Sequence, residues 1–259
     1  MKIGFIGMGN MAQAIVAGWN KTSQREAEEI LAYAPNGRKL RENAARLGFR
    51  PMDSLRELAD ESDWIIIACK PYQVEAVLEE VSESLKDKPL LSIALGWNYG
   101  RLQAALGAEQ RVRYVMPSTP AEVGEGVFLL EDMHNLTDRE EEISRLLFAG
   151  IGQVLVIPSR LMGIAGTISG CGPAFADMMI EAFADAAVKY GLPREASYPL
   201  VSQMLLGAAK LQRDTGRHPA VLKDAVCSPG GSTIRGVTAL EEKGLRAACQ
   251  AAIDAVMNP

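Results

Sequence analysis

The sequence contains few of the residues on which disulfide scaffolds, metal centres and membrane proteins depend. Its 259 residues include four cysteines and two histidines, and aromatic residues make up 6%. The cysteines lie far apart and form no CxxC pair, so we expect neither a disulfide framework nor a metal site. No apolar run approaches the ~18–20 residues of a membrane helix, and the N-terminal run is too short for a signal peptide. We therefore expect a cytoplasmic protein that does not bind membranes.

The charge of the chain is mildly acidic and unevenly distributed. Lys and Arg total 27 and Asp and Glu total 32, a net charge of −5 that argues against a nucleic-acid partner. Residues 161–259 carry nine basic and nine acidic side chains, so the excess negative charge lies in residues 1–160. The neutral part is rich in Ala, Gly, Leu and Met, which is typical of a helical core or of surface hidden in an oligomer.

Short apolar strands alternate with amphipathic helices up to residue 158. The segment 64–69 is apolar without alternation, as in a parallel strand covered on both faces. Such alternation of strands and helices implies right-handed crossovers and a doubly wound, mostly parallel sheet. The predicted strands are residues 2–6, 30–34, 64–69, 90–95, 112–116, 127–130 and 154–157.

The pattern changes after Pro158, and the remaining chain shows long helical periodicity. The fold class is therefore α/β, followed by an all-helical C-terminal domain. We place the two domains at residues 1–158 and 159–259. The helices predicted in the second domain are residues 173–190, 194–214, 218–226, 232–242 and 244–257.

A glycine-rich turn, Gly7-x-Gly9-x-x-Ala12, joins the first predicted strand to the first helix. The first glycine allows the tight turn, the second lets the backbone approach a pyrophosphate, and the small third residue lets the helix pack on the strand. The N–H groups at the helix start then face the phosphates. We therefore predict dinucleotide binding, rather than a plain turn, by Ile6, Gly7, Met8, Gly9, Asn10 and Met11.

The turn after the second predicted strand indicates which dinucleotide is bound. Folds that bind NAD usually place a carboxylate there for the ribose 2′-hydroxyl, but here the first carboxylate is Glu42, inside the helix. Asn36, Arg38 and Lys39 can instead bind a 2′-phosphate. The expected cofactor is NADP, with NADPH preferred and NADH possible. A solvated basic helix start is the plainer alternative.

A second loop at the expected cofactor edge follows the strand 64–69. It consists of Ala68, Cys69, Lys70 and Pro71. Ligand crevices of α/β sheets lie at the carboxyl ends of the strands, so Lys70 is expected to point toward the cofactor. The alternative is an exposed loop lysine without a role.

The helical segment contains two further glycine-rich stretches. Residues 169–173 read as a flexible loop that leads into the long helix, with Pro173 at a first helical position, and a simple helix start is the alternative. Residues 228–233 combine a Gly-Gly loop, three hydroxyls and a new helix start. The free N–H groups there can bind a carboxylate, and the Thr233 hydroxyl can hydrogen-bond a substrate nitrogen. A capped turn is the alternative.

Taken together, these motifs resemble the pyrroline-5-carboxylate reductase family. The matching stretches are collinear over nearly the whole chain, and HPAVLKDAVCSPGGSTI (218–234) is close to a diagnostic signature. The resemblance implies a Rossmann-type domain, homodimers that intertwine through the helical domain, and in many members further assembly into rings. It implies hydride transfer from NAD(P)H to L-Δ1-pyrroline-5-carboxylate, giving L-proline in the final step of proline biosynthesis.

The resemblance also implies roles for individual residues. Ala94 joins the cofactor-binding residues, and Thr233 becomes the catalytic residue, with its hydroxyl bonded to the ring nitrogen of the substrate. The backbone N–H groups of the second glycine-rich loop would hold the substrate carboxylate. The substrate-binding residues implied in this way are Ser228, Pro229, Gly230, Gly231, Ser232 and Thr233.

Four positions depart from the common family pattern, namely Leu95, Trp97, Ser118 and Cys171. Leu95 and Trp97 stand where small residues are usual, beside the nicotinamide region. Two alternatives therefore stay open. One is a non-catalytic, nucleotide-binding regulatory paralogue, and the other is a reductase of a different imine or of a β-hydroxyacid. The hydroxyacid alternative is weakened because the first long helix of the second domain has no early lysine.

Overall fold

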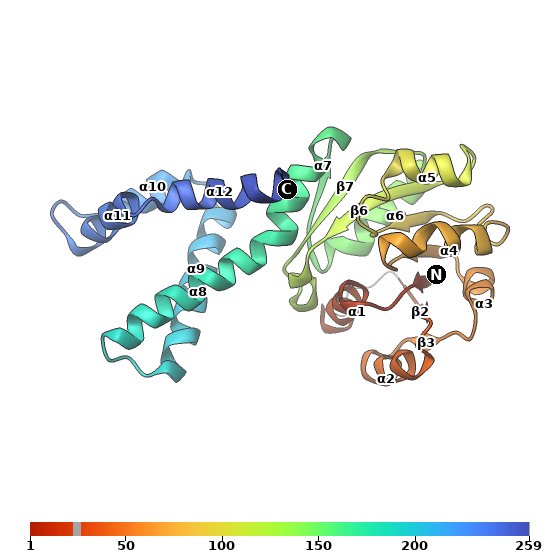
Figure 1. Cartoon of the computed structure of the whole chain (residues 1–259), viewed down its shortest axis with the longest axis horizontal. Coiled ribbons are helices and arrows are strands. Elements are labelled where there is room, and N and C mark those ends of the chain that lie inside the picture. Colours follow the sequence, from red (N-terminus) through yellow and green to blue (C-terminus); the bar gives the residue numbers. More distant parts are fainter. Residues whose placement is uncertain (23–26, 259) are drawn as a thin grey trace. The chain divides into compact units, whose positions relative to one another are not determined.

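The computed structural model describes residues 1–22 and 27–258 and divides into two compact units, Met1–Gly170 and Cys171–Pro259 (Figure 1). Residues 159–170 follow the expected domain boundary but pack with the first unit. Their short helix α7 (Met162–Gly166) buries Met162 beside Tyr114 and Leu129. Among the described residues, no helix is long and apolar enough to cross a bilayer.

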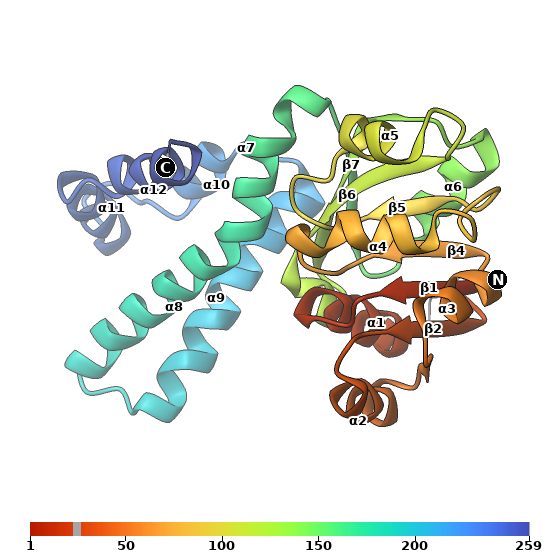
Figure 2. The ribbon, with the colours of Figure 1, turned by 45° about the vertical axis from the view of Figure 1, so that its right-hand side comes forward.

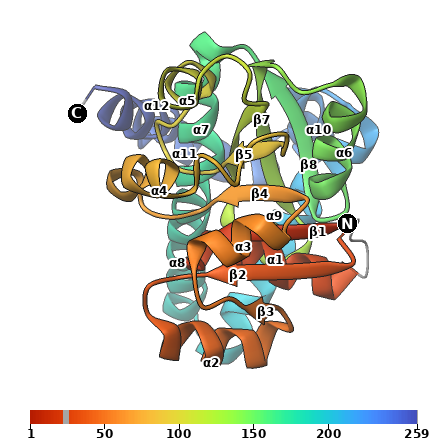
Figure 3. The same ribbon diagram turned by 90° about the vertical axis from the view of Figure 1, so that its right-hand side faces the viewer.

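The first unit is built on an eight-stranded sheet with the order β3-β2-β1-β4-β5-β6-β7-β8 (Figure 2). Neighbouring strands are parallel except for the antiparallel pair β6–β7, which confirms the predicted doubly wound, mostly parallel sheet. Figure 3 shows β2, β1 and β4 lying side by side. The strands are β1 Lys2–Ile6, β2 Glu29–Tyr33, β3 Arg50–Pro51, β4 Trp64–Ile67, β5 Leu90–Ser92, β6 Val112–Pro117, β7 Gly126–His134 and β8 Gly152–Ile157.

Helices cover both faces of the sheet. This coverage explains why the sequence of β4 is apolar throughout. Trp64 and Ile66 point into the cluster formed with α1, α2 and α6, whereas Ile65 and Ile67 point into the cluster formed with α3, α4 and α5. In a strand that is buried on both faces, no position faces solvent, so polar and apolar residues do not alternate. The helices are α1 Asn10–Thr22, α2 Gly37–Leu47, α3 Leu55–Glu61, α4 Val74–Val81, α5 Tyr99–Leu106 and α6 Asp138–Ala149.

The second unit is helical and has almost no core of its own. Helices α8 and α9 lie side by side, and the shorter helices follow (Figures 1 and 2). Among the described residues of this unit, the side chains of Ala184, Ser197 and Val201 are the buried ones. The helices are α8 Gly172–Lys189, α9 Arg194–Thr215, α10 Pro219–Ala225, α11 Ser232–Glu242 and α12 Leu245–Met257.

The prediction of a flexible loop at residues 169–173 is wrong. A π-helical turn, Thr167–Cys171, connects α7 directly to α8, so the backbone stays helical through both glycines. Pro173 gives a physical reason. It has no N–H to donate to the carbonyl four residues earlier, and its ring crowds that carbonyl. A wider turn of π type relieves this conflict without ending the helix.

The strands also differ from the prediction, and β4 and β5 end at Ile67 and Ser92, short of the predicted ends at residues 69 and 95. Sequence pattern did not predict β3 (Arg50–Pro51), because two exposed residues carry no periodic signal. Strand β7 runs on from the predicted end at Leu130 to His134, so Glu131 and His134 lie in a strand. Glu131 is buried there, and its carboxylate accepts a hydrogen bond from Tyr99 N at 2.8 Å.

Candidate active site

The turn between β1 and α1 has the geometry that a pyrophosphate site needs. Gly7 has φ +101°, and a Cβ at this position would lie 2.6 Å from Cys69 N, so only glycine fits. At Gly9, by contrast, an added Cβ would meet nothing within 4 Å. The first turn of α1 contains no acidic residue, and the first N–H groups of a helix have no acceptor within it. The turn therefore fits the phosphates of a dinucleotide.

Backbone hydrogen bonds bring the other predicted cofactor loops to the same edge of the sheet. Ala68 N donates to Ile6 O at 2.8 Å, and Ile93 N donates to Ile67 O at 2.9 Å. The loop Ala68 to Pro71 and the turn at Ala94 therefore adjoin the β1–α1 turn along the carboxyl ends of β1, β4 and β5. Lys70 is exposed there.

Several of these predicted residues reach the cofactor edge with their backbone alone. The side chains of Ile6, Met8 and Ala94 are buried in the core of the first unit. Asn10 is exposed and Met11 half-buried at the start of α1. Burial raises the pKa of the Cys69 thiol to about 11, so this cysteine stays protonated at neutral pH and is not a nucleophile.

The start of α2 carries the predicted contacts to a 2′-phosphate. Asn36 is its N-cap, and the side-chain oxygen accepts a hydrogen bond from Lys39 N at 3.0 Å. Arg38 is 87% exposed, with its Nε 3.8 Å from a carboxylate oxygen of Glu42. The helix start is thus rigidly capped, while the guanidinium stays accessible to an anion.

Sequence reasoning missed Arg41 as a member of this basic cluster. Its guanidinium folds back over the start of α2, where a Cβ on Gly37 would lie 3.5 Å from Nη1. The available signal was spacing, because residues 38 and 41 lie three apart and share a helix face.

The loop predicted to bind the substrate is a tight turn ahead of α11. Gly231 N donates to Ser228 O at 3.0 Å, and Gly230 has φ +69°. A Cβ on Gly231 would crowd the Ser228 hydroxyl, which would have to rotate away to admit a larger residue. Arg235 Nη1 donates to Gly230 O at 3.1 Å and braces the turn.

The first turn of α11 is arranged to receive an anion. Its N-cap is Gly231, which supplies no capping side chain, and no acidic residue lies in the first turn. The N–H groups that a capping side chain would otherwise occupy are left for another acceptor. Thr233 lies exposed in this first turn. The loop belongs to the helical unit, whereas the cofactor edge belongs to the first unit.

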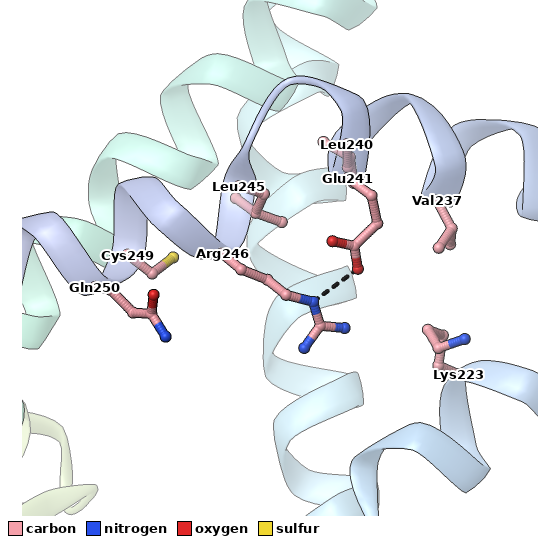
Figure 4. A pocket seen from close by; sticks show the side chains of 8 residues that line it. All are labelled: Lys223, Val237, Leu240, Glu241, Leu245, Arg246, Cys249 and Gln250. Carbon is pink, nitrogen blue, oxygen red and sulfur yellow. Dashed lines mark hydrogen bonds and ion pairs between the residues drawn. The ribbon is translucent and has the colours of Figure 1, made fainter.

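A separate open hollow of about 470 Å³ lies among α10, α11 and α12 (Figure 4). Its charged side chains are paired. Arg246 Nε donates to Glu241 at 2.7 Å, and Lys223 Nζ bonds Asp224 at 2.6 Å. None of the predicted substrate-binding residues lines it. The lining consists of Lys223, Val237, Leu240, Glu241, Leu245, Arg246, Cys249 and Gln250.

Comparison with known proteins adds two family matches and several relatives. Residues 159–259 match the model for pyrroline-5-carboxylate reductase dimerisation, and residues 2–96 match that for NADP oxidoreductase coenzyme F420-dependent. Pyrroline-5-carboxylate reductase of Treponema pallidum is 41% identical, covering 100% of this chain and 99% of the relative. The Escherichia coli enzyme of that name is 40% identical over 95% of this chain and 92% of the relative.

A solved structure agrees with these matches. The crystal structure of Plasmodium falciparum pyrroline carboxylate reductase with NADP bound has a TM-score of 0.88 and 33% identity, covering 99% of this chain and 95% of that one. The chain belongs to the pyrroline-5-carboxylate reductase family.

Proposed function

We propose that this chain reduces L-Δ1-pyrroline-5-carboxylate to L-proline with NADPH, the final step of proline biosynthesis. The observation that carries the proposal is the loop ahead of α11, which offers backbone N–H groups and the Thr233 hydroxyl side by side. The substrate is a cyclic imine with one carboxylate, so it needs one anion site and one hydrogen-bonding group at nitrogen. The loop supplies both.

The residues orient the substrate and hold its charge, and NADPH supplies the hydride when bound. The free N–H groups in the first turn of α11 bind the carboxylate, and the Thr233 hydroxyl bonds the ring nitrogen. Protonation of that nitrogen by water makes the C=N carbon electrophilic. The hydride forms a new C–H bond there while the C=N electron pair moves to nitrogen, giving a secondary amine and NADP⁺. Orientation is the main requirement of such a step.

The side chains at the start of α2 set the choice of dinucleotide. The positively charged guanidinium of Arg38 is exposed to solvent, and the N-cap at Asn36 fixes the backbone at the start of α2. A ribose 2′-phosphate is a strong acceptor for a guanidinium, whereas a 2′-hydroxyl gains little from it. We infer that NADPH binds more tightly than NADH.

The working molecule in this proposal is a homodimer formed through the helical unit. Large apolar side chains of α8 and α9 are exposed, with Met178 at 69% and Leu206 at 53%. A unit with three buried side chains among its described residues cannot be stable unless a second surface covers it. A second copy of this chain supplies that surface. Rings of dimers and a cytoplasmic location are further proposals.

One assay separates this function from its alternatives. Purified protein is mixed with NADPH or NADH and with pyrroline-5-carboxylate, other cyclic imines or 2-oxo acids, and oxidation of the dinucleotide is followed. The proposal requires fastest turnover with pyrroline-5-carboxylate and formation of L-proline. Tight NADPH binding without oxidation by any substrate would instead support a regulatory protein. Preference for a 2-oxo acid would support a hydroxyacid enzyme.

A further inference from the structure

Leu95 is a large apolar side chain that the first unit holds exposed at the carboxyl edge of its sheet. It lies in a turn closed by Trp97 N, which donates to Ala94 O at 3.1 Å. Gly96 has φ +77°, the value that a type II turn requires at its third residue. Leu95 is 66% exposed, although Ala94 and Trp97 are each 2% exposed. The turn therefore displays Leu95 toward solvent while its first and fourth residues, Ala94 and Trp97, are buried.

Trp97 fixes this turn against the loop that follows β4. Its indole Nε1–H donates to Pro71 O at 2.9 Å, across 26 residues of sequence. The guanidinium of Arg101 lies 3.9 Å from the centroid of the indole ring. Pro71 itself begins a short 3₁₀ turn directly after Lys70. The two loops at the ends of β4 and β5 are therefore held in one fixed arrangement.

The strand order places these two loops on the nicotinamide side of the cofactor site. In the order β3-β2-β1-β4-β5, the direction of the chain connections reverses at β1, where the pyrophosphate binds. The basic start of α2 follows β2 and faces the adenosine half. The nicotinamide half must then extend over the ends of β4 and β5, where Leu95 stands. Hydride transfer brings the reacting atoms to ~3–3.5 Å, so the substrate ring lies at the same place.

We propose that Leu95 is a specificity-determining residue for the reduction proposed above. Its side chain packs against the carbon atoms of the reacting cyclic imine and limits the size of the ring, and Trp97 is the positioning residue that fixes it. The ring carbons need an apolar contact, and Leu95 presents one on a preorganised turn.

The test compares two ring sizes in the same enzyme. NADPH-dependent kcat/KM is measured with pyrroline-5-carboxylate and with the cyclic imino acid one carbon larger. Binding of L-proline and of its six-membered homologue L-pipecolate to the NADP⁺-loaded protein is measured by calorimetry. We define the ring-size ratio as kcat/KM for the six-membered imino acid divided by kcat/KM for pyrroline-5-carboxylate. Leu95→Ala should raise this ratio by about tenfold, the usual effect of one methylene group or more in an apolar pocket. The ratio of the two binding constants should move the same way.

Matched variants separate the loss of the Leu95 contact to the substrate from a loss of protein stability. Leu95→Met keeps the volume and should keep the wild-type ratio. Leu146→Ala makes the same change at a 47% exposed leucine on α6 and should leave both ratios unchanged. Trp97→Phe removes the indole N–H together with part of the ring system, and it should shift the ring-size ratio in the direction of Leu95→Ala, chiefly through kcat. Thermal unfolding and the NADPH dissociation constant are measured for each variant.

Two results would overturn the inference. One is a Leu95→Ala enzyme whose ring-size ratios equal those of the wild type. The other is a rise in the NADPH dissociation constant with unchanged ratios, which would make Leu95 a cofactor contact instead. Failure of the proposed function is distinguishable, because the wild-type protein would then not reduce pyrroline-5-carboxylate at all.

Discussion

Single side chains divide into those that hold the fold and those that face a ligand, and exposure alone does not separate them. Met8 and Ala94 are buried, yet their backbone lies at the cofactor edge. Arg38 and Thr233 are exposed, and both contribute the group that would touch a ligand. The residue scale is therefore tested best by substitutions that remove one functional group and leave the backbone unchanged.

Removal of the Thr233 hydroxyl tests the proposed bond to the substrate nitrogen. Thr233→Ala should lower kcat/KM for pyrroline-5-carboxylate by about tenfold to a thousandfold, as loss of a transition-state hydrogen bond does. NADPH binding and thermal stability should not change. Thr238→Ala, an exposed threonine further along α11, is the matched control. Full turnover by Thr233→Ala would remove the residue from the mechanism.

Reversal of charge at Arg38 tests the assignment of the 2′-phosphate. Arg38→Glu should lower the NADPH-to-NADH ratio of kcat/KM by about tenfold or more, since each tenfold corresponds to ~1.4 kcal/mol. Arg56→Glu changes the charge equally on the exposed surface of α3 and should leave the ratio as it is. The assignment fails if the two variants behave alike.

At the scale of elements, the turn from β1 to α1 separates a folding requirement from a binding requirement. Gly7 abuts the backbone of β4's exit loop, whereas Gly9 faces open space. Gly7→Ala should therefore destabilise the protein by about 2 kcal/mol or more, because a positive φ and a close contact are both violated. Gly9→Ala should fold normally but weaken NADPH binding by about tenfold. Urea unfolding and fluorescence titration with NADPH measure the two effects, and loss of stability in both variants would contradict this division.

The contact between β7 and α6 should make stability depend on pH. Burial lowers the pKa of His134, and the Arg113 and Arg145 guanidinium groups lower it further, against the opposing carboxylate of Glu141. In the unfolded chain, His134 binds a proton near the ordinary histidine pKa of ~6.5. In the folded chain, His134 binds this proton only at a lower pH. The stability that comes from neutral His134 is therefore complete above that pH and is lost as the pH falls toward the folded pKa.

A pair of histidine variants can isolate this effect, because the chain contains two histidines. Urea unfolding midpoints are measured between about pH 5 and pH 8. His134→Gln should flatten the fall in stability below the ordinary histidine pKa, whereas His218→Gln should retain it. A His134→Gln protein with the wild-type slope would show that other groups cause the dependence.

For the whole molecule, the two units differ in how they become stable. The first unit has two extensive buried clusters, one on each face of its sheet. In the second unit the apolar side chains of α8 and α9 remain largely exposed. The charge distribution agrees with this difference, since residues 161–259 carry no net charge. A neutral, apolar surface favours association with a second copy.

Sedimentation equilibrium checks this association. The wild-type protein should have at least twice the mass of one chain. Leu206→Glu places a charge on the exposed apolar surface of α9 and should weaken the dimer by about tenfold or more, with a lower Tm. Leu146→Glu, on α6 of the first unit, should leave the mass unchanged. A monomeric wild-type protein would contradict the proposed homodimer.

The sequence by itself determined the features that local chemistry controls. Gly7 and Gly9 predicted the tight turn between β1 and α1, and the unbroken apolar run at β4 predicted a buried parallel strand, because both patterns act over a few residues. Three things needed the tertiary structure, namely the Trp97 bond to Pro71, the fold-back of Arg41 over Gly37, and the helical path through residues 169–173. The Trp97 bond joins residues far apart in sequence, and the other two depend on side-chain or backbone geometry that composition and periodicity do not encode. Local sequence thus selected the kind of site, and packing between distant segments decided how its walls are held.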